Sequence, residues 1–276
     1  MKMQSLMAAV ACTGTVMLAS GSPLMAAVTT TTDTTTTSAV NDGTINNGEY
    51  VSGGIAGING GFGNVIGSGA ALFIDSGTDG ALNFGLRKGP GSFSDVAVIY
   101  LDTTAGGATD LVGITDNSSR LRAAISGNGE FSDSSNVVFA AGFDADYAIG
   151  ITYQFGTSAT LFSIGANGAL TQVATGSLTP GTDGVTVAER EFAFTLANLG
   201  LTPGSSFDYV ATYLNPGNAF RSNEFIGVTP GSFAENPGNN NTITLGSNDF
   251  NTFVTVPEPA SLALVGLAGL FLLRKR

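Results

Sequence analysis

The 276-residue chain contains no histidine and no tryptophan, and only 11% of its residues are charged. The absence of histidine excludes Ser-His-Asp and Cys-His catalysis, and it also excludes zinc sites built on imidazole. The absence of tryptophan removes the largest aromatic platform for a sugar ring. The charged fraction lies well below the roughly 25% of ordinary soluble domains. Catalysis that depends on an imidazole is therefore excluded.

A single cysteine, Cys12, lies in the N-terminal apolar run, so disulfides contribute nothing to the mature fold. The formal net charge of −11 repels phosphate backbones and argues against a nucleic-acid partner. Glycine is abundant, with 39 residues. Together with many threonine, serine, asparagine and valine residues, it predicts short strands joined by tight turns.

The N-terminus has the parts of a secretory signal peptide. Lys2 supplies a positive charge, residues 6–20 are apolar or small, and Ala26-Ala27 provides a small-residue exit. We expect a signal helix over residues 1–27 that signal peptidase removes; a buried N-terminal helix is the alternative. Residues 28–40 are rich in threonine and have little apolar surface to offset their ordering entropy. They are predicted to form a flexible spacer.

The C-terminus is built of three parts in order. An apolar run of 14 residues, 260–273, follows Pro257, Glu258 and Pro259 and precedes Arg274, Lys275 and Arg276. As a helix this run spans about 21 Å, which is short of the roughly 30 Å of a bilayer core. It is predicted to be a short transmembrane helix that inserts transiently, with its basic end in the cytoplasm. An ordinary short anchor is the alternative.

This C-terminal order resembles the PEP-CTERM sorting signal. The resemblance implies that an exosortase processes the tail, residues 257–276, near its Pro-Glu-Pro sequence, and that Glu258 is a recognition residue for that protease. It also implies inner-membrane processing and a final place at the cell surface, in the outer membrane or outside the cell. The bacterium of origin would make exopolysaccharide.

Between the two ends, turn dipeptides alternate with short β-type runs, and no window shows a helical period. Strands are predicted at residues 71–75, 81–86, 96–102, 147–153, 159–164, 169–173, 191–196, 206–213, 241–245 and 251–256. The predicted fold class is all-β, with residues 41–256 forming one domain. We expect a single antiparallel β-sandwich that is jelly-roll-like.

The body carries a second resemblance, in short pieces. They include the segment Asp42-Gly-Thr-Ile-Asn-Asn-Gly-Glu-Tyr50, the run Val98-Ile-Tyr-Leu-Asp102, and Gly142-Phe-Asp-Ala-Asp-Tyr-Ala-Ile149. These pieces resemble exported sandwich domains related to the DOMON and family-nine carbohydrate-binding superfamily. The resemblance implies a sugar-binding, haem-binding or structural module. The body has no histidine and no methionine to ligate haem.

Acidic side chains of the body are candidate metal ligands. Asp144 and Asp146 share one strand face, and with Asp102 they are predicted to form a Ca²⁺ site at one end of the sandwich. The alternative for all three is a solvated carboxylate or an acceptor for backbone amides. A second set of calcium-like composition, without EF-hand spacing, comprises Asp42, Asn46 and Glu49. No other cofactor is expected.

Other side chains are candidates for contacts with sugars. Glu189 and Glu191 share a strand face and are a candidate carboxylate pair for glycoside hydrolysis. Arg120 and Arg122 are predicted on one strand face, where they could hold a carboxylated polysaccharide. Candidates for stacking on sugar rings are Tyr100, Tyr147, Tyr153, Tyr209 and Tyr213. The alternatives are core packing for the rings and a plain charged surface for the arginines.

The glycine-rich segment 53–63 lacks the Lys-Ser/Thr pair of a phosphate-binding loop, which argues against a nucleotide site. The chain is expected not to be an enzyme. We expect an exosortase-processed surface or matrix protein with a structural or interaction role in exopolysaccharide or biofilm. The alternatives are a carbohydrate-binding module and a carboxylate-dependent glycoside hydrolase. Expected partners are signal peptidase, exosortase and exopolysaccharide, and no nucleic acid.

Overall fold

The computed structural model describes residues 28–257, apart from residues 36, 52–53, 154–157, 182–183, 231–232 and 234. The predicted signal peptide and all of the tail after Pro257 lie outside the described residues. Within the described part of the chain, no helix is long and apolar enough to cross a membrane.

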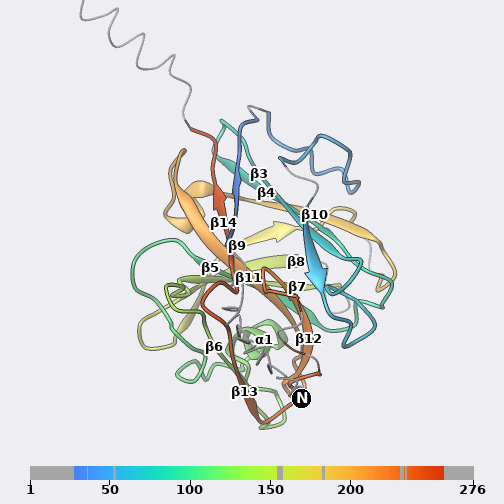
Figure 1. Ribbon diagram of the computed structural model, residues 1–276, viewed down its shortest axis with the longest axis vertical. Helices are drawn as coiled ribbons and strands as arrows, with labels where there is room; N and C mark the ends of the chain where they lie inside the picture. Colours follow the sequence, from blue (N-terminus) through green and yellow to red (C-terminus); the bar gives the residue numbers. More distant parts are fainter. Residues whose placement is uncertain are drawn as a thin grey trace, which may run out of the picture.

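A 12-stranded sheet forms most of the body, and a 2-stranded sheet accompanies it (Figure 1). The large sheet contains β1 (Thr29–Thr32), β2 (Ile55–Ile58), β3 (Ala71–Ser76), β4 (Ala81–Arg87), β5 (Val96–Asp102), β7 (Tyr147–Thr152), β8 (Ser158–Ile164), β9 (Leu170–Ser177), β10 (Glu189–Thr195), β11 (Ser206–Asn215), β12 (Phe220–Ile226) and β14 (Asn251–Val254). The small sheet pairs β6 (Ser135–Val138) with β13 (Asn241–Thr244). Every run predicted as a strand from the sequence is present.

The large sheet curls until its two ends nearly meet. Its main path runs β10-β4-β3-β2-β12-β11-β5-β7-β8-β9, with antiparallel neighbours. Just after β9, Thr179 exchanges two backbone hydrogen bonds of 2.8 and 2.9 Å with Glu191 of β10. The predicted all-β antiparallel class is confirmed. One continuous sheet supplies both layers that face each other across the core.

Strand β5 is buried on both faces, which explains its unbroken apolar sequence. One face of β5 packs into the core enclosed by the curled sheet, and the other packs into a second core outside it. The inner residues are Ala97, Ile99 and Leu101, and the outer residues are Val96, Val98 and Tyr100. Because alternate residues of a strand point to opposite faces, β5 contributes side chains to both cores.

A short helix, α1 (Arg120–Ser126), covers the outer core. Ser119 caps its N-terminus by accepting from the Arg122 amide, and Gly127 ends it at φ 68°. The sequence analysis predicted a strand face for Arg120 and Arg122, which is wrong. Two helical turns are too short for a clear 3.6-residue period, so caps and tertiary packing decided the outcome.

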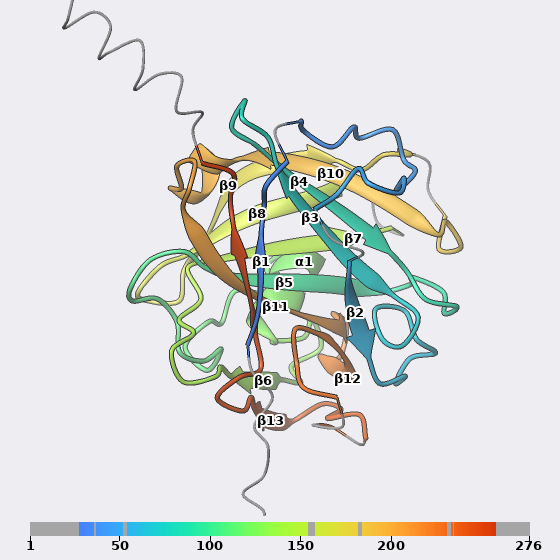
Figure 2. The same cartoon turned by 45° about the horizontal axis from the view of Figure 1, so that its top comes forward.

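The prediction of a flexible spacer over residues 28–40 is wrong for its first part. Thr29–Thr32 form β1, which pairs in parallel with β14 (Figure 2). Asp33 then enters the interior, where its Oδ2 accepts from the amide and hydroxyl of Ser76, both at 2.7 Å. Backbone pairing and a buried carboxylate order a segment that has almost no apolar surface of its own.

Candidate functional site

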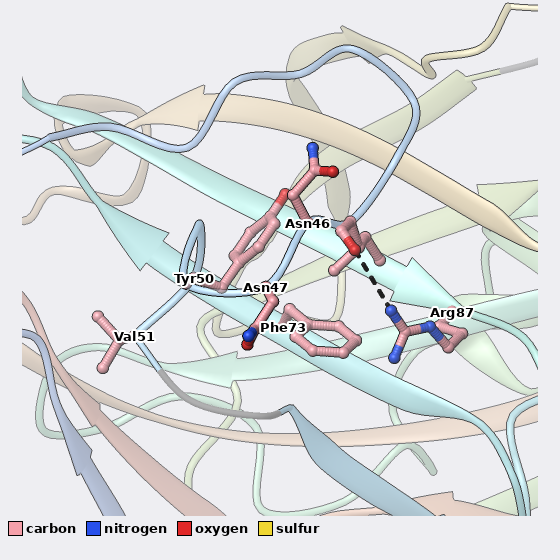
Figure 3. Close-up of a pocket in the computed structure, with 8 residues that line it drawn as sticks. Asn46, Asn47, Tyr50, Val51, Phe73 and Arg87 are labelled. Carbon is pink, nitrogen blue, oxygen red and sulfur yellow. Dashed lines mark hydrogen bonds between the residues drawn. The ribbon is translucent and has the colours of Figure 1, made fainter.

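A loop folds over strands β3 and β4 and leaves an open pocket of about 500 Å³ beside it. The loop contributes residues 45–48, Tyr50 and Val51, while β3 contributes Phe73 and β4 contributes Arg87. Figure 3 shows Arg87 and Val51 at opposite ends of this pocket. We call the segment from Ile45 to Val51 the pocket loop.

The base of the pocket is aromatic but largely covered. The rings of Tyr50 and Phe73 lie 5.7 Å apart at 54°, and the Arg87 guanidinium lies 5.0 Å from the centre of the Phe73 ring. Both rings are buried, with 5% and 4% of their surface exposed. They therefore offer a ligand an apolar edge rather than a stacking face.

Arg87 is the cationic group of the pocket. Its Nε donates to Glu189 Oε1 at 2.6 Å, and its Nη2 donates to the Ile45 carbonyl at 3.4 Å, the bond drawn in Figure 3. The side chain remains 41% exposed. Because Glu189 neutralises the charge while part of the guanidinium stays open, Arg87 can still donate to a polar ligand.

Glu189 and Glu191 hold the pocket loop in place. Glu189 Oε2 accepts from the Ile45 amide at 2.9 Å. Glu191 accepts from the Gly43 amide at 2.6 Å and from the Tyr50 hydroxyl at 2.8 Å. Burial raises the pKa of Glu191, and burial together with its bond to Glu191 raises the pKa of Tyr50. Both carboxylates are thus committed to the chain itself.

The pocket loop also lines a second hollow, of about 460 Å³. It shares Asn46, Asn47 and Gly48 with the first, and it adds Asp42 and Glu49. Glu49 accepts from the Val40 amide at 2.8 Å and from the Asn46 amide at 2.9 Å, which fixes the turn between the hollows. The calcium-like set of Asp42, Asn46 and Glu49 is therefore mainly a scaffold for this loop.

The predicted Ca²⁺ ligands are neighbours, but they bind backbone amides. Asp146 Oδ2 accepts from the amides of Thr103 and Thr104, both at 2.8 Å, and Asp102 Oδ2 accepts from the Asp144 amide at 2.8 Å. Among the residues that the structure describes, no group of three or more acidic or thiol side chains has the arrangement of a metal site. The alternative of amide acceptors therefore describes Asp102 and Asp146, and calcium binding stays a prediction.

Most of the tyrosines considered for sugar stacking are core residues. Tyr100, Tyr153, Tyr209 and Tyr213 are each only 1% exposed, whereas Tyr147 is half-buried. The Tyr153 ring, for example, stacks on Phe93 with centroids 3.9 Å apart. The alternative of core packing is confirmed for these four rings.

Sequence reasoning missed Arg87 and the tyrosine that lines the pocket, Tyr50. No local pattern marks Arg87, because it lies far along the chain from the pocket loop that it meets, and Tyr50 was named only as the end of a segment that carries the DOMON-like resemblance. The nearest signal was the acidic and amide composition of residues 42–49, which the sequence analysis considered as a calcium-like set without EF-hand spacing. Only the pairing of β4 with β10 brings Arg87 beside Glu189.

Of the predicted sorting residues, Pro257 is exposed at the end of the described chain. Glu258, Pro259, Arg274, Lys275 and Arg276 lie outside the described residues. Residues 255–276 match the model of the PEP-CTERM protein-sorting motif. A search of curated proteins finds no match to the chain. The motif makes exosortase the processing partner and implies an exported protein sorted to the cell envelope. The DOMON-like resemblance of the body is not confirmed.

Proposed function

We propose that the exported body is a non-enzymatic protein of the cell surface or extracellular matrix that binds exopolysaccharide at the pocket loop. The observation that carries this proposal is the pair of open hollows that share Asn46, Asn47 and Gly48. Each hollow has a volume in the range of small-molecule sites. A chain of sugar units can occupy both, with the loop between them.

The groups around the hollows suit a hydroxyl-rich ligand. Asparagine amides both donate and accept, and the open part of the Arg87 guanidinium donates. The edges of Tyr50 and Phe73 add a small apolar surface at the base of the first hollow. Because Glu189 balances Arg87, and Asp42 and Glu49 border the second hollow, a neutral polysaccharide fits better than a strongly anionic one.

The positions of the two glutamates in the predicted catalytic pair support binding rather than cleavage. A glycosidase needs one carboxyl group to protonate the leaving oxygen and a second to act on the opposite side of the sugar. Glu191 is fully buried, and both of its oxygens already accept hydrogen bonds. Glu189 is held between Arg87 and the Ile45 amide. Neither carboxyl group is free for acid–base work.

Retention of the mature protein on the exopolysaccharide of its own cells tests the proposal. We expect Arg87→Ala and the double variant Asn46→Ala/Asn47→Ala to lose retention. Arg120→Ala is the comparison variant, because its side chain is similarly exposed, at 34%, but belongs to α1; loss of retention in this variant instead would favour the arginine pair predicted from the sequence. Equal retention of all variants on the exopolysaccharide would show that the pocket loop is not the binding site. Shortening of the polymer would favour the hydrolase, and a matrix defect on deletion without any binding would favour a purely structural role.

A further inference from the structure

The sorting motif and the folded body overlap. The match to the motif starts at Thr255, yet Thr255 is fully buried and Val256 is only 4% exposed. Pro257 is the first exposed residue of the tail. The recognition sequence therefore begins at the surface of the body, with no free spacer before it.

Hydrogen bonds hold Thr255 and Val256 from two sides. The Thr255 amide and hydroxyl donate to the Ser205 carbonyl at 2.8 and 2.9 Å, and the Gly204 amide donates to the Val256 carbonyl at 3.0 Å. On the other side, the Val256 amide donates to Ser76 Oγ at 2.8 Å. Ser76 is in turn bound by Asp33. We call these residues the tail clasp: Asp33, Ser76, Gly204, Ser205, Thr255 and Val256.

The clasp limits how far the recognition sequence can move from the body. An extended chain spans at most about 3.3–3.6 Å per residue, so residues 257–259 reach only about 10 Å from the last clasped residue. A protease that holds Glu258 in its binding site must then lie against the surface from which Pro257 leaves. Detaching Val256 instead would break two hydrogen bonds, the one from its amide to Ser76 Oγ and the one from the Gly204 amide to its carbonyl.

That surface has an unusual composition for so acidic a chain. It consists of the β3–β4 turn, residues 77–80, and the segment 195–206, which are joined by a bond of 2.9 Å from the Leu196 amide to the Gly80 carbonyl. Its only charged residue is Asp79; the other residues that are not buried are threonine, serine, glycine, alanine, asparagine and proline, whereas Leu196, Leu199 and Leu201 are buried. Figure 2 shows this end of the molecule opposite β6 and β13. We call it the exit face.

We infer that the exit face is a docking surface for the exosortase, and that the mature protein keeps its chain through Val256. A small, nearly uncharged surface can approach a membrane-embedded protease without the repulsion that the acidic remainder of the body would meet at anionic lipids. Because hydrogen bonds of the tail clasp fix Thr255 and Val256, the recognition sequence that follows starts from a defined position on the body. This inference rests on the sorting motif and is independent of polysaccharide binding.

Site-specific photo-crosslinking in cells that process the full-length precursor tests the inference. A benzoylphenylalanine probe replaces Ala197 or Thr202, which are exposed on the exit face. The control position is Phe131, an aromatic residue that is 75% exposed and precedes β6, the strand that Figure 2 shows at the opposite end of the molecule. We expect a crosslink to the exosortase from both exit-face positions, none from Phe131, and loss of the crosslink when Glu258→Ala is added.

Mass spectrometry of the released protein tests the second half of the inference. We expect a mature C-terminus at Val256 or later, with the exit-face variants processed as the wild type. Several results would overturn the inference: processing without an exosortase crosslink from the exit face, equal crosslinking from Phe131, crosslinks to lipid alone, or a mature chain that ends before Val256.

Discussion

A buried carboxylate, Glu224, organises residues 62–67, at the end of the glycine-rich segment 53–63 that the sequence analysis rejected as a nucleotide site and just beyond it. Its side chain is fully buried on β12. Oε2 accepts from the amides of Val65, Ile66 and Gly67 at 2.8, 2.8 and 3.2 Å, and Oε1 accepts from the Phe62 amide at 2.6 Å. The loop thus surrounds an anion that belongs to the protein itself.

Replacing this carboxylate should destabilise the fold severely. Glu224→Ala leaves four amides without their acceptor, and each buried unsatisfied donor costs about 1 kcal/mol or more, so we expect a loss of about 4 kcal/mol. That is a large share of the roughly 5–15 kcal/mol of net stability of an ordinary domain. Glu224→Gln keeps one accepting oxygen but places an NH₂ group against backbone amides that also donate, and we expect the free energy of unfolding to fall by about 2 kcal/mol.

Urea unfolding of the mature protein, followed by circular dichroism and tyrosine fluorescence, measures these losses as shifts of the midpoint at constant slope. Glu130→Gln is the control, because Glu130 is part of a surface ion pair with Arg120 at 3.6 Å. Such pairs contribute about 0–1 kcal/mol. If Glu224→Ala unfolded within about 1 kcal/mol of the wild type, the account of this loop would be refuted.

Three further predictions concern buried polar groups. Burial raises the pKa of Asp102 to about 6, so the folded protein holds this proton more tightly than the unfolded chain does. The free energy of unfolding should therefore fall as the pH rises from about 4 to 6. Thermal melting across this range should show a weaker fall in Asp102→Asn, and an equal pH dependence in the variant and the wild type would contradict the role given to Asp102. The Tyr153 hydroxyl is buried without a hydrogen-bond partner among the described residues, whereas the Tyr100 hydroxyl donates to the Ile125 carbonyl at 2.7 Å. In urea unfolding, Tyr153→Phe should therefore be neutral or stabilising and Tyr100→Phe should cost about 1 kcal/mol; the reverse order would be evidence against this reasoning. Asp33→Ala removes the acceptor that anchors the end of β1, so hydrogen exchange at residues 29–32 should become fast, while unchanged protection would mean that pairing with β14 is sufficient alone.

Local patterns predicted much of the fold. Alternation and turn dipeptides located the strands from β3 to β5 and from β7 to β11, because the period of two is written into each segment. The strands that were missed are short or polar, namely β1, β2, β6 and β12. In β12 the sequence Phe-Arg-Ser-Asn-Glu-Phe-Ile has an almost entirely polar centre. It is buried because Arg221 and Glu224 find partners in distant segments.

The candidate site was predictable only in part. The sequence marked the acidic and amide residues of the pocket loop, but it gave no sign that they serve as a scaffold. Glu191 meets Gly43 and Tyr50 across most of the length of the body. Such partners depend on strand order, which local composition does not encode.

By itself, the sequence determined the all-β class, the sorting motif, and the exclusion of histidine and disulfide chemistry. Each of these depends on composition or on neighbours along the chain. The tertiary structure alone decided which carboxylates are buried anchors, where the two hollows lie, and that the sorting motif begins inside the folded body. These depend on burial and on hydrogen bonds between distant segments, because a carboxylate's surroundings, not its identity, determine its role.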